Sequence, residues 1–253
     1  IEWGVNMRFL SLPIKPILLC SLLSISVIPT LIVSLELYSF AKQNAHQVLD
    51  EKHLSLANNL TAPVYAYLEN HRTVVQSIAR RMQDEIRPKK SIEAFLSTEK
   101  ADFKNIKQLA YFDVRKNQVY LPDPQISNSQ IIINLGSTPC LKTQSGFFSS
   151  IIKNPFSTAN TVLICEPVFT QQKVSGVVIA ALSLDMIEQY RAGIAFGESG
   201  HAAIVDQAGV VVAHPNLDWT KENKDISDWP IVKALINGEQ GITQFYSSFT
   251  KRE

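Results

Sequence analysis

The most apolar part of the chain is a single run near its N-terminus. Residues 16–35 contain no charged side chain and are rich in leucine, isoleucine, valine and serine. A helix rises about 1.5 Å per residue, so this run matches the roughly 30 Å hydrocarbon core of a bilayer. Pro29 should kink the helix, which membrane spans tolerate better than soluble helices do. We therefore expect a transmembrane helix over residues 16–37.

Charged residues on either side of the run indicate its orientation. Arg8 and Lys15 precede it and Glu36 follows it, so the positive-inside rule places the N-terminus in the cytoplasm and residues after 37 outside. The alternatives are a buried core helix and a signal peptide cleaved near residues 39–41, a small-x-small site. Because the run is long and uncharged, we favour an uncleaved anchor in the inner (cell) membrane.

A helical stripe of apolar residues follows the run. From residue 38 to 87 glycine is absent and Pro63, which should bend the helix, is the only proline. Apolar residues recur three, four or seven positions apart, as on one face of a helix. They are Leu49, Leu56, Leu60, Val64, Leu68, Val75, Ile78, Met82 and Ile86. Arg87-Pro88 should end the pattern, because a residue before proline avoids the helical region. We expect a stalk or dimerisation helix over residues 38–90.

Strand-like patterns replace the helical spacing after a short helix at residues 91–104, which Ser91 could cap. The ranges that read as strands are 108–113, 118–121, 160–169 and 174–182, with a shorter one at 131–133. Polar turns join the first pair and the last pair, and Asp113 should bond to the backbone of its turn. These elements predict one antiparallel-sheet module over residues 91–192.

A second and smaller set of elements follows a connecting helix at residues 184–190. It comprises strands at 201–205 and 210–213, a helix at 228–236 that starts near Pro230, and a strand from Gly241 to Tyr246. Asp206 should serve the turn between the first two strands. A PAS-like sheet needs about five strands, so we expect the second module, residues 193–253, to be incomplete. Because the chain opens with Ile1 instead of Met and ends without a terminating signal, we expect both ends to be cut.

The expected fold class is therefore α+β. A cytoplasmic N-terminus (1–15) precedes the transmembrane helix (16–37) and the stalk (38–90). Two PAS-like antiparallel-sheet modules then follow in series, membrane-distal at 91–192 and membrane-proximal at 193–253.

Composition and cysteine content narrow the function classes. The chain has 24 basic and 23 acidic residues, without the clustered basic excess that a nucleic-acid partner would need. Cys140 and Cys165 would lie in an oxidising compartment, where a disulfide is possible, although two buried free thiols are slightly favoured. We expect no metal, because neither a CxxC motif nor a metal-type spacing of histidines is present.

Catalytic motifs are missing as well. The sequence contains no phosphate-binding loop, no nucleophile elbow and no paired catalytic carboxylates. Ser199 superficially fits a Gly-x-Ser-x-Gly motif, but His201 replaces the last glycine. His214 precedes a proline and is interpreted as a turn residue bonded to backbone. We therefore expect no enzymatic activity within these residues and no cofactor.

The order of these elements resembles the double Cache family of extracytoplasmic ligand sensors. The similar segments are Gly197–Pro215, with its glycines, strand, turn, strand and His-Pro pair, and residues 166–169 followed by 176–178. The resemblance covers about residues 38–253. It implies two PAS-like sheets on one long helix and a small-molecule ligand in the distal module. It also implies a cytoplasmic output domain: methyl-accepting signalling, histidine kinase or diguanylate cyclase.

The resemblance also suggests where a ligand binds. Some family members bind amino acids through an Arg, a Trp and a Tyr before the paired strands and an Asp in the last distal strand. Here Phe147 and Phe148 occupy the aromatic stretch, and Ala181 stands where the carboxylate is expected. Because a buried ammonium group needs an acceptor, we expect a ligand other than an amino acid, such as a small organic acid or a largely apolar molecule. The candidate ligand-binding residues are Tyr111, Tyr120, Phe147, Phe148 and Ala181.

Together these observations predict the ligand-sensing region of a bacterial transmembrane receptor, either a histidine kinase, a chemoreceptor or a diguanylate cyclase. The long helix and the proximal module would transmit the signal, and the apolar stripe predicts a homodimer. The alternative is a membrane-anchored exported enzyme or adhesion module without signalling output.

Overall fold

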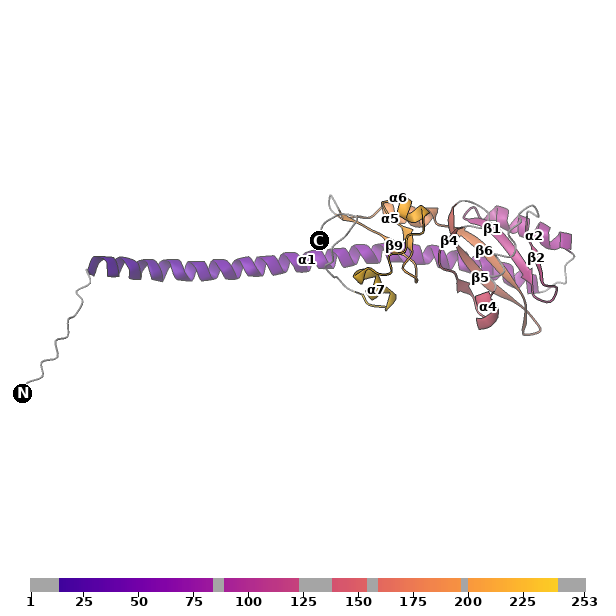
Figure 1. Cartoon of the computed structure of the whole chain (residues 1–253), viewed down its shortest axis with the longest axis horizontal. Helices are drawn as coiled ribbons and strands as arrows, with labels where there is room; N and C mark the ends of the chain where they lie inside the picture. The colour runs from indigo at the N-terminus through magenta and orange to yellow at the C-terminus, as the bar shows by residue number, and fades with distance from the viewer. Residues whose placement is uncertain (1–13, 84–88, 123–137, 154–158, 197–199, 241–253) are drawn as a thin grey trace, which may run out of the picture. The chain divides into compact units, whose positions relative to one another are not determined.

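The computed structural model describes residues 14–83, 89–122, 138–153, 159–196 and 200–240 (Figure 1). The chain divides into two compact units, residues 1–53 and 54–253. The expected strands at 131–133 and 241–246 and the expected helix end at Arg87-Pro88 lie outside the described residues.

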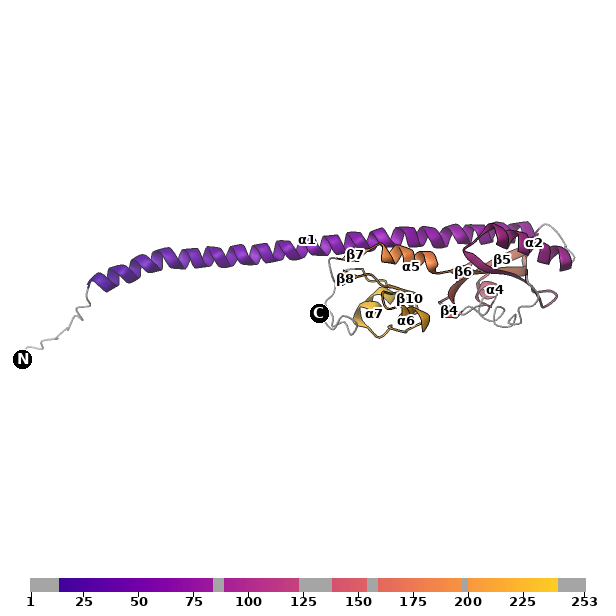
Figure 2. The same ribbon diagram turned by 90° about the horizontal axis from the view of Figure 1, so that it is seen from above.

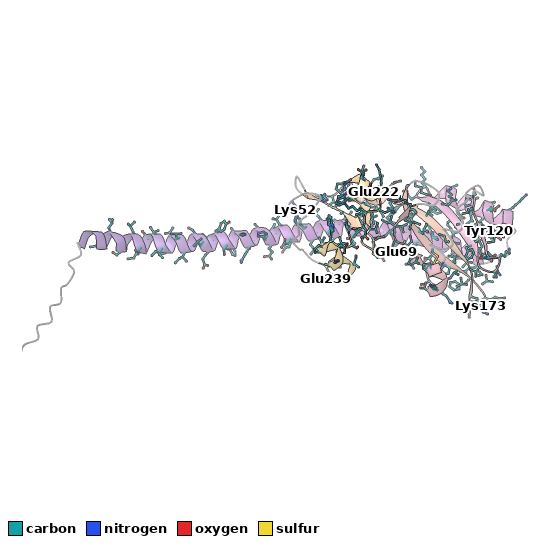
Figure 3. All side chains as sticks on the ribbon, viewed as in Figure 1. Lys52, Glu69, Tyr120, Lys173, Glu222 and Glu239 are labelled. Atoms are coloured by element: carbon teal, nitrogen blue, oxygen red, sulfur yellow. A yellow bond between two sulfur atoms is a disulfide. The ribbon has the colours of Figure 1, made fainter. Side chains whose placement is uncertain are left out.

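Helix α1 (Ile14–Gln83) covers both the predicted transmembrane helix and most of the predicted stalk. It is helical through Pro29 and through Pro63. Its large apolar side chains between Leu18 and Phe40 are exposed (Figure 3). In the described part of the chain, this is the one helix long and apolar enough to cross a membrane.

Several hydroxyl groups of this apolar segment donate hydrogen bonds to backbone carbonyls of the same helix. Thr30 donates to the carbonyl of Ser26 at 2.6 Å, and Ser21 donates to the carbonyl of Leu18 at 2.9 Å. Hydroxyls paired in this way need no water, so they do not prevent the segment from lying in an apolar environment.

The second unit contains a six-stranded antiparallel sheet. Its strands are β1 (Ile106–Asp113), β2 (Gln118–Tyr120), β3 (Phe147–Phe148), β4 (Ile152–Lys153), β5 (Asn160–Thr170) and β6 (Lys173–Ser183). The order is β2-β1-β6-β5-β3, and β4 also pairs with β5. The four predicted strands and both turns are confirmed. Gln171 and Gln172 both adopt positive φ angles, 51° and 64°, which suit a tight two-residue hairpin.

One face of this sheet packs against α1 and α2 (Lys89–Asp102), which lie on the same side of it in Figure 2. Val75 and Ile78 of α1 and Leu96 of α2 are fully buried there. Arg81 makes a two-pronged salt bridge to Glu99 at 2.5–2.6 Å, which joins the two helices. Helix α2 begins two residues before Ser91, so that serine lies within the helix and does not cap it.

The opposite face of the sheet carries a disulfide bond. Cys140 of α4 (Thr138–Thr143) is bonded to Cys165 of β5, so the slight preference for two free thiols is wrong. The two cysteines are 25 positions apart in sequence, and only the folding of α4 over β5 brings them together. Both side chains are fully buried.

Short elements follow the large sheet. They are α5 (Asp185–Ala192), β7 (Ala195–Phe196), β8 (Gly200–His201), β9 (Ile204–Val205), β10 (Val211–Ala213), α6 (Leu217–Lys221) and α7 (Pro230–Ile236). The single strand expected at 201–205 is wrong, because β8 pairs with β7 while β9 pairs with β10. Ala202 and Ala203 separate the two pieces. Helix α7 begins at Pro230 as expected.

Candidate ligand-binding site

The five residues predicted to line a ligand pocket lie on opposite faces of the six-stranded sheet. Tyr111, Tyr120 and Phe148 belong to the face that packs on α1 and α2. Phe147 and Ala181 belong to the face that carries the disulfide. The structure therefore does not bring all five together, and at most one of the two groups can contact a given ligand.

The two tyrosines fill the core beside α1 and α2. Tyr111 and Tyr120 are 4% and 2% exposed, and their rings stack with centroids 5.9 Å apart. Burial raises the pKa of Tyr111 to about 12. Gly176 of β6 leaves room for the Tyr111 ring, because a β-carbon there would overlap it. These contacts are those of packed core residues.

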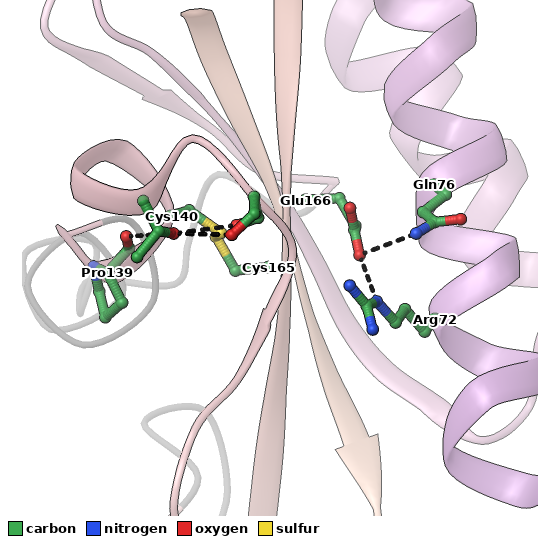
Figure 4. The surroundings of a disulfide bond; sticks show 8 residues. Arg72, Gln76, Pro139, Cys140, Cys165 and Glu166 are labelled. Atoms are coloured by element: carbon green, nitrogen blue, oxygen red, sulfur yellow. Dashed lines mark hydrogen bonds and ion pairs between the residues drawn. A yellow bond between two sulfur atoms is a disulfide. The ribbon is translucent and has the colours of Figure 1, made fainter.

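A buried carboxylate on the same face connects the sheet to α1. Glu166 of β5 accepts a hydrogen bond from Arg72 Nε at 2.9 Å and a longer one from Gln76 Nε2 at 3.4 Å (Figure 4). The bond to Glu166 raises the pKa of Arg72, whose guanidinium also lies 5.7 Å from the ring centre of Phe148. Cys165, the preceding residue, extends to the other side of the strand. Adjacent residues of β5 thus fasten α1 and α4 to opposite faces.

The disulfide face contains an unexpected polar group. Gln108 of β1 is 2% exposed, and neither its Oε1 nor its Nε2 has a hydrogen-bond partner among the described residues. It is in register with Ala181 of β6, which in turn is in register with Leu163 of β5. Because directly opposed residues share a face, all three side chains lie on the disulfide side. Sequence reasoning missed Gln108, because a glutamine in a strand carries no signal that it is buried.

A cluster of rings occupies the smaller module. His214 is 2% exposed, stacks on Trp219 with centroids 4.4 Å apart, and accepts a hydrogen bond from the Asn216 N–H at Nδ1. Burial, together with the smaller effect of nearby His201, lowers the pKa of His214 to about 4. The expected backbone-bonded role of His214 is confirmed. No group of three metal-binding side chains occurs among the described residues.

A groove of about 660 Å³ lies between α1 and the same module. Its walls are mostly apolar. Two of the polar side chains in it already have partners, since Thr61 donates to the Ala57 carbonyl and Gln207 donates to Ser150 Oγ. The lining residues are Ala57, Leu60, Thr61, Val64, Tyr65, Leu68, Ala202, Ala203, Ile204, Val205, Asp206, Gln207, Leu235 and Ile236. This groove offers little to hold a charged molecule.

Asp206 joins the two modules. Its Oδ1 accepts hydrogen bonds from the N–H groups of Ala208 and Val210, both at 2.9 Å, as its expected turn role requires. Its Oδ2 accepts from the N–H of Ile151, which lies next to β4 of the large sheet, at 2.9 Å. Asp113 serves the other turn in the same way, through Arg115 N at 2.9 Å. A shift of the strand edge near Ile151 would therefore move the turn at Asp206.

The architecture is shared with a known protein family. A family model described as the Cache domain matches residues 38–252. The chain belongs to the Cache domain family. No curated protein matches it. The family match covers all the described elements from the middle of α1 onward, and it confirms the resemblance seen in the sequence.

Solved structures share the fold of this Cache chain. The extracellular domain of mmHK1S-Z2, described as a histidine kinase, has a TM-score of 0.66 and 14% identity, covering 79% of this chain and 88% of that one. The ligand-binding domain of the Pseudomonas fluorescens chemoreceptor CtaA with L-isoleucine has a TM-score of 0.62 and 15% identity, covering 74% and 77%. The ligand-binding domain of the Pseudomonas aeruginosa chemoreceptor PctB with L-glutamine has a TM-score of 0.57 and 16% identity. The match covers 70% of this chain and 72% of the PctB chain.

These structures correct the expected ligand class. The expectation that the ligand is not an amino acid is wrong, because CtaA and PctB have this fold and hold L-isoleucine and L-glutamine. Ala181 supplies no carboxylate for an ammonium group. An ammonium group needs an acceptor, but that acceptor can come from a neighbouring strand.

Proposed function

We propose that residues 38–253 are the extracytoplasmic ligand-sensing region of a bacterial transmembrane receptor. The observation that carries the proposal is where the family match starts. It begins at residue 38, shortly after the uncharged apolar run at residues 16–35 of α1. A sensor domain that begins where an apolar helix of membrane-spanning length ends suits a receptor anchored by that helix.

The disulfide supports export of this region independently. Cysteine bridges persist in oxidising compartments and are rare in the cytoplasm. Cys140 and Cys165 are bonded within the large-sheet module. This agrees with the orientation expected from Lys15 before the apolar run and Glu36 after it.

We place the ligand, an amino acid or a close analogue, on the disulfide face of the six-stranded sheet. The other face packs against α1 and α2 and is filled by buried core residues of the sheet and these helices. On the disulfide face Phe147 and Ala181 remain candidate contacts. The amino-acid complexes of proteins with the same fold support this ligand class. Cache sensor domains bind ligands and are non-catalytic, so we assign no reaction to this region.

Two contacts give ligand binding a route to the membrane. Glu166 and Arg72 fasten β5 to α1, and Asp206 and Ile151 fasten the smaller module to the sheet. Binding that shifts β5 would bias the packing of α1, and a second copy of α1 in a homodimer would respond. The output would be a histidine kinase, chemotaxis or diguanylate cyclase domain in the cytoplasm.

A pair of reporter fusions tests the export. Alkaline phosphatase, which works outside the cytoplasm, and a reporter that works only inside it are each fused after Phe169, in the turn region between β5 and β6. We expect activity from the phosphatase fusion alone. A fusion after Lys15 serves as the matched control and should give the opposite pattern. Activity of the cytoplasmic reporter after Phe169 would contradict the proposal.

A further inference from the structure

Gln108 is a buried amide on the disulfide face of the six-stranded sheet. It is 2% exposed, and both polar atoms of its side chain lack a partner among the described residues. Buried polar side chains nearly always have hydrogen-bond partners, so each exception needs an explanation. Apolar residues of similar length would fill the same space without the desolvation cost.

The described residues around Gln108 offer its side chain no hydrogen-bond partner. On its face of the sheet, Ala181 lies opposite on β6, Leu163 follows on β5, and Ala110 lies two positions along β1. The hydroxyl of Ser149, which lies beside Leu163, is occupied: its Oγ accepts from the Leu163 N–H and donates to the Ser150 carbonyl. The two alanines flank the amide with the smallest side chains of the cluster.

We propose that Gln108 recognises the polar end of the ligand and that the ligand is a free amino acid in its zwitterionic form. The neutral amide has an acceptor, Oε1, and a donor, Nε2, side by side. An α-ammonium group can donate to Oε1 while the adjacent carboxylate accepts from Nε2. This assignment rests on the proposed sensor function, and it places the acceptor on β1, beside Ala181 on β6.

The chemistry discriminates between ligand classes. An α-amino acid presents both charges within one small group, and each bond to the amide is then assisted by a charge. A dicarboxylic acid would leave Oε1 unpaired, and a simple amine would leave Nε2 unpaired. A site built around a buried group rejects molecules that leave it unpaired.

The test uses the 253-residue chain in detergent micelles. Thermal unfolding is followed by tryptophan fluorescence with each of the twenty L-amino acids as probe, and the affinity of any that stabilises the chain is measured by calorimetry. The variants are Gln108→Met, which keeps length but removes both polar atoms, and Gln108→Asn, which keeps the amide but shortens it. Gln189→Met, on the exposed surface of α5, is the matched control.

We expect Gln108→Met to unfold at the same temperature as the wild type or higher without ligand, and to bind the amino acid at least about tenfold more weakly. Gln108→Asn should bind with intermediate affinity, and Gln189→Met like the wild type. The 2-oxo acid that carries the same side chain as the amino acid lacks the ammonium group. We expect it to bind tightly to neither the wild type nor any of the variants. A purely structural glutamine would instead lower the unfolding temperature and leave binding intact.

The outcomes separate the two proposals. If an amino acid stabilises the wild type and stabilises Gln108→Met equally, Gln108 is not the recognition group, while the sensor proposal survives. If no amino acid stabilises the wild type, both the proposed ligand class and the role of Gln108 are refuted.

Discussion

Removing the positive charge beside Glu166 should loosen α1 from the large sheet. The Glu166 side chain is 7% exposed, and Arg72 Nε lies 2.9 Å from its Oε1. Its other described donor, Gln76 Nε2, is 3.4 Å away and therefore bonds weakly. In the Arg72→Met variant, the buried Glu166 carboxylate would keep only the weak, neutral donor Gln76. The variant tests whether this pair fastens the helix to β5.

The structure sets the expected size of the effect. Breaking a buried ion pair by removing one partner costs about 3–5 kcal/mol. The Arg72 side chain is 29% exposed, so water can partly solvate the carboxylate once the guanidinium is gone. We therefore expect a loss of about 2–3 kcal/mol in the free energy of unfolding, which lowers the midpoint by roughly 5–10 °C in a region of this size.

A double-mutant cycle separates the charge from the packing. Glu166→Gln in the Arg72→Met background removes the stranded charge and should restore about 1 kcal/mol or more. Arg80→Met, on the exposed side of the same helix, is the matched control and should change stability by no more than about 0.5 kcal/mol. Each variant is melted in detergent micelles and followed by far-ultraviolet circular dichroism and tryptophan fluorescence.

Two results would refute the reasoning. If Arg72→Met costs the same whether residue 166 is Glu or Gln, the arginine acts through its packing over Phe148 and the ion pair contributes nothing. If Arg80→Met is as destabilising as Arg72→Met, the loss reflects the helix in general and not the contact with β5.

Two further predictions concern the smaller module. Gly209 and Gly238 both have a φ of +82°, but a β-carbon would overlap Ser227 at Gly209 and meet nothing within 4 Å at Gly238. Gly238→Ala should therefore lower the free energy of unfolding by about 1–2 kcal/mol, from left-handed backbone strain alone. Gly209→Ala should lower it clearly more, and equal unfolding midpoints for the two variants would show that the overlap with Ser227 is relieved. Because the pKa of His214 falls from 6.5 to about 4 on folding, the unfolded chain binds more protons between those values. Stability should fall by up to about 1.4 kcal/mol per unit as pH drops from 6.5 to 4, and His214→Gln should remove that slope in pH-dependent melts.

Local patterns were sufficient to predict most of the elements. The uncharged run, the helical spacing through residue 83 and the β-branched strands β5 and β6 each follow from the residues themselves. Pro230 at the start of α7 and the turn aspartates acted as expected, because capping and turn chemistry depend on neighbours in the chain. These signals also sufficed to suggest the family.

Local residue patterns did not reveal on which face of the six-stranded sheet each residue lies. Eight consecutive residues of β5 and nine of β6 are buried, because α1 and α2 cover one side of the sheet and the disulfide cluster covers the other. A strand covered on both sides has no alternation of apolar and polar residues to reveal its orientation. The five predicted pocket residues were therefore assigned to one pocket, although they belong to two faces.

Partners that are distant in sequence were decided by the tertiary structure alone. Whether Cys140 and Cys165 are bonded depends on α4 folding over β5, and the division of residues 201–205 depends on β8 and β9 having different partners. Among the described residues the amide of Gln108 has no partner, and the pairing of β1 with β6 places it opposite Ala181. The sequence by itself determined which segments are helices and strands, because those depend on local spacing. The packing of the sheet decided which side chains a ligand can reach, because burial and pairing depend on residues far apart in the chain.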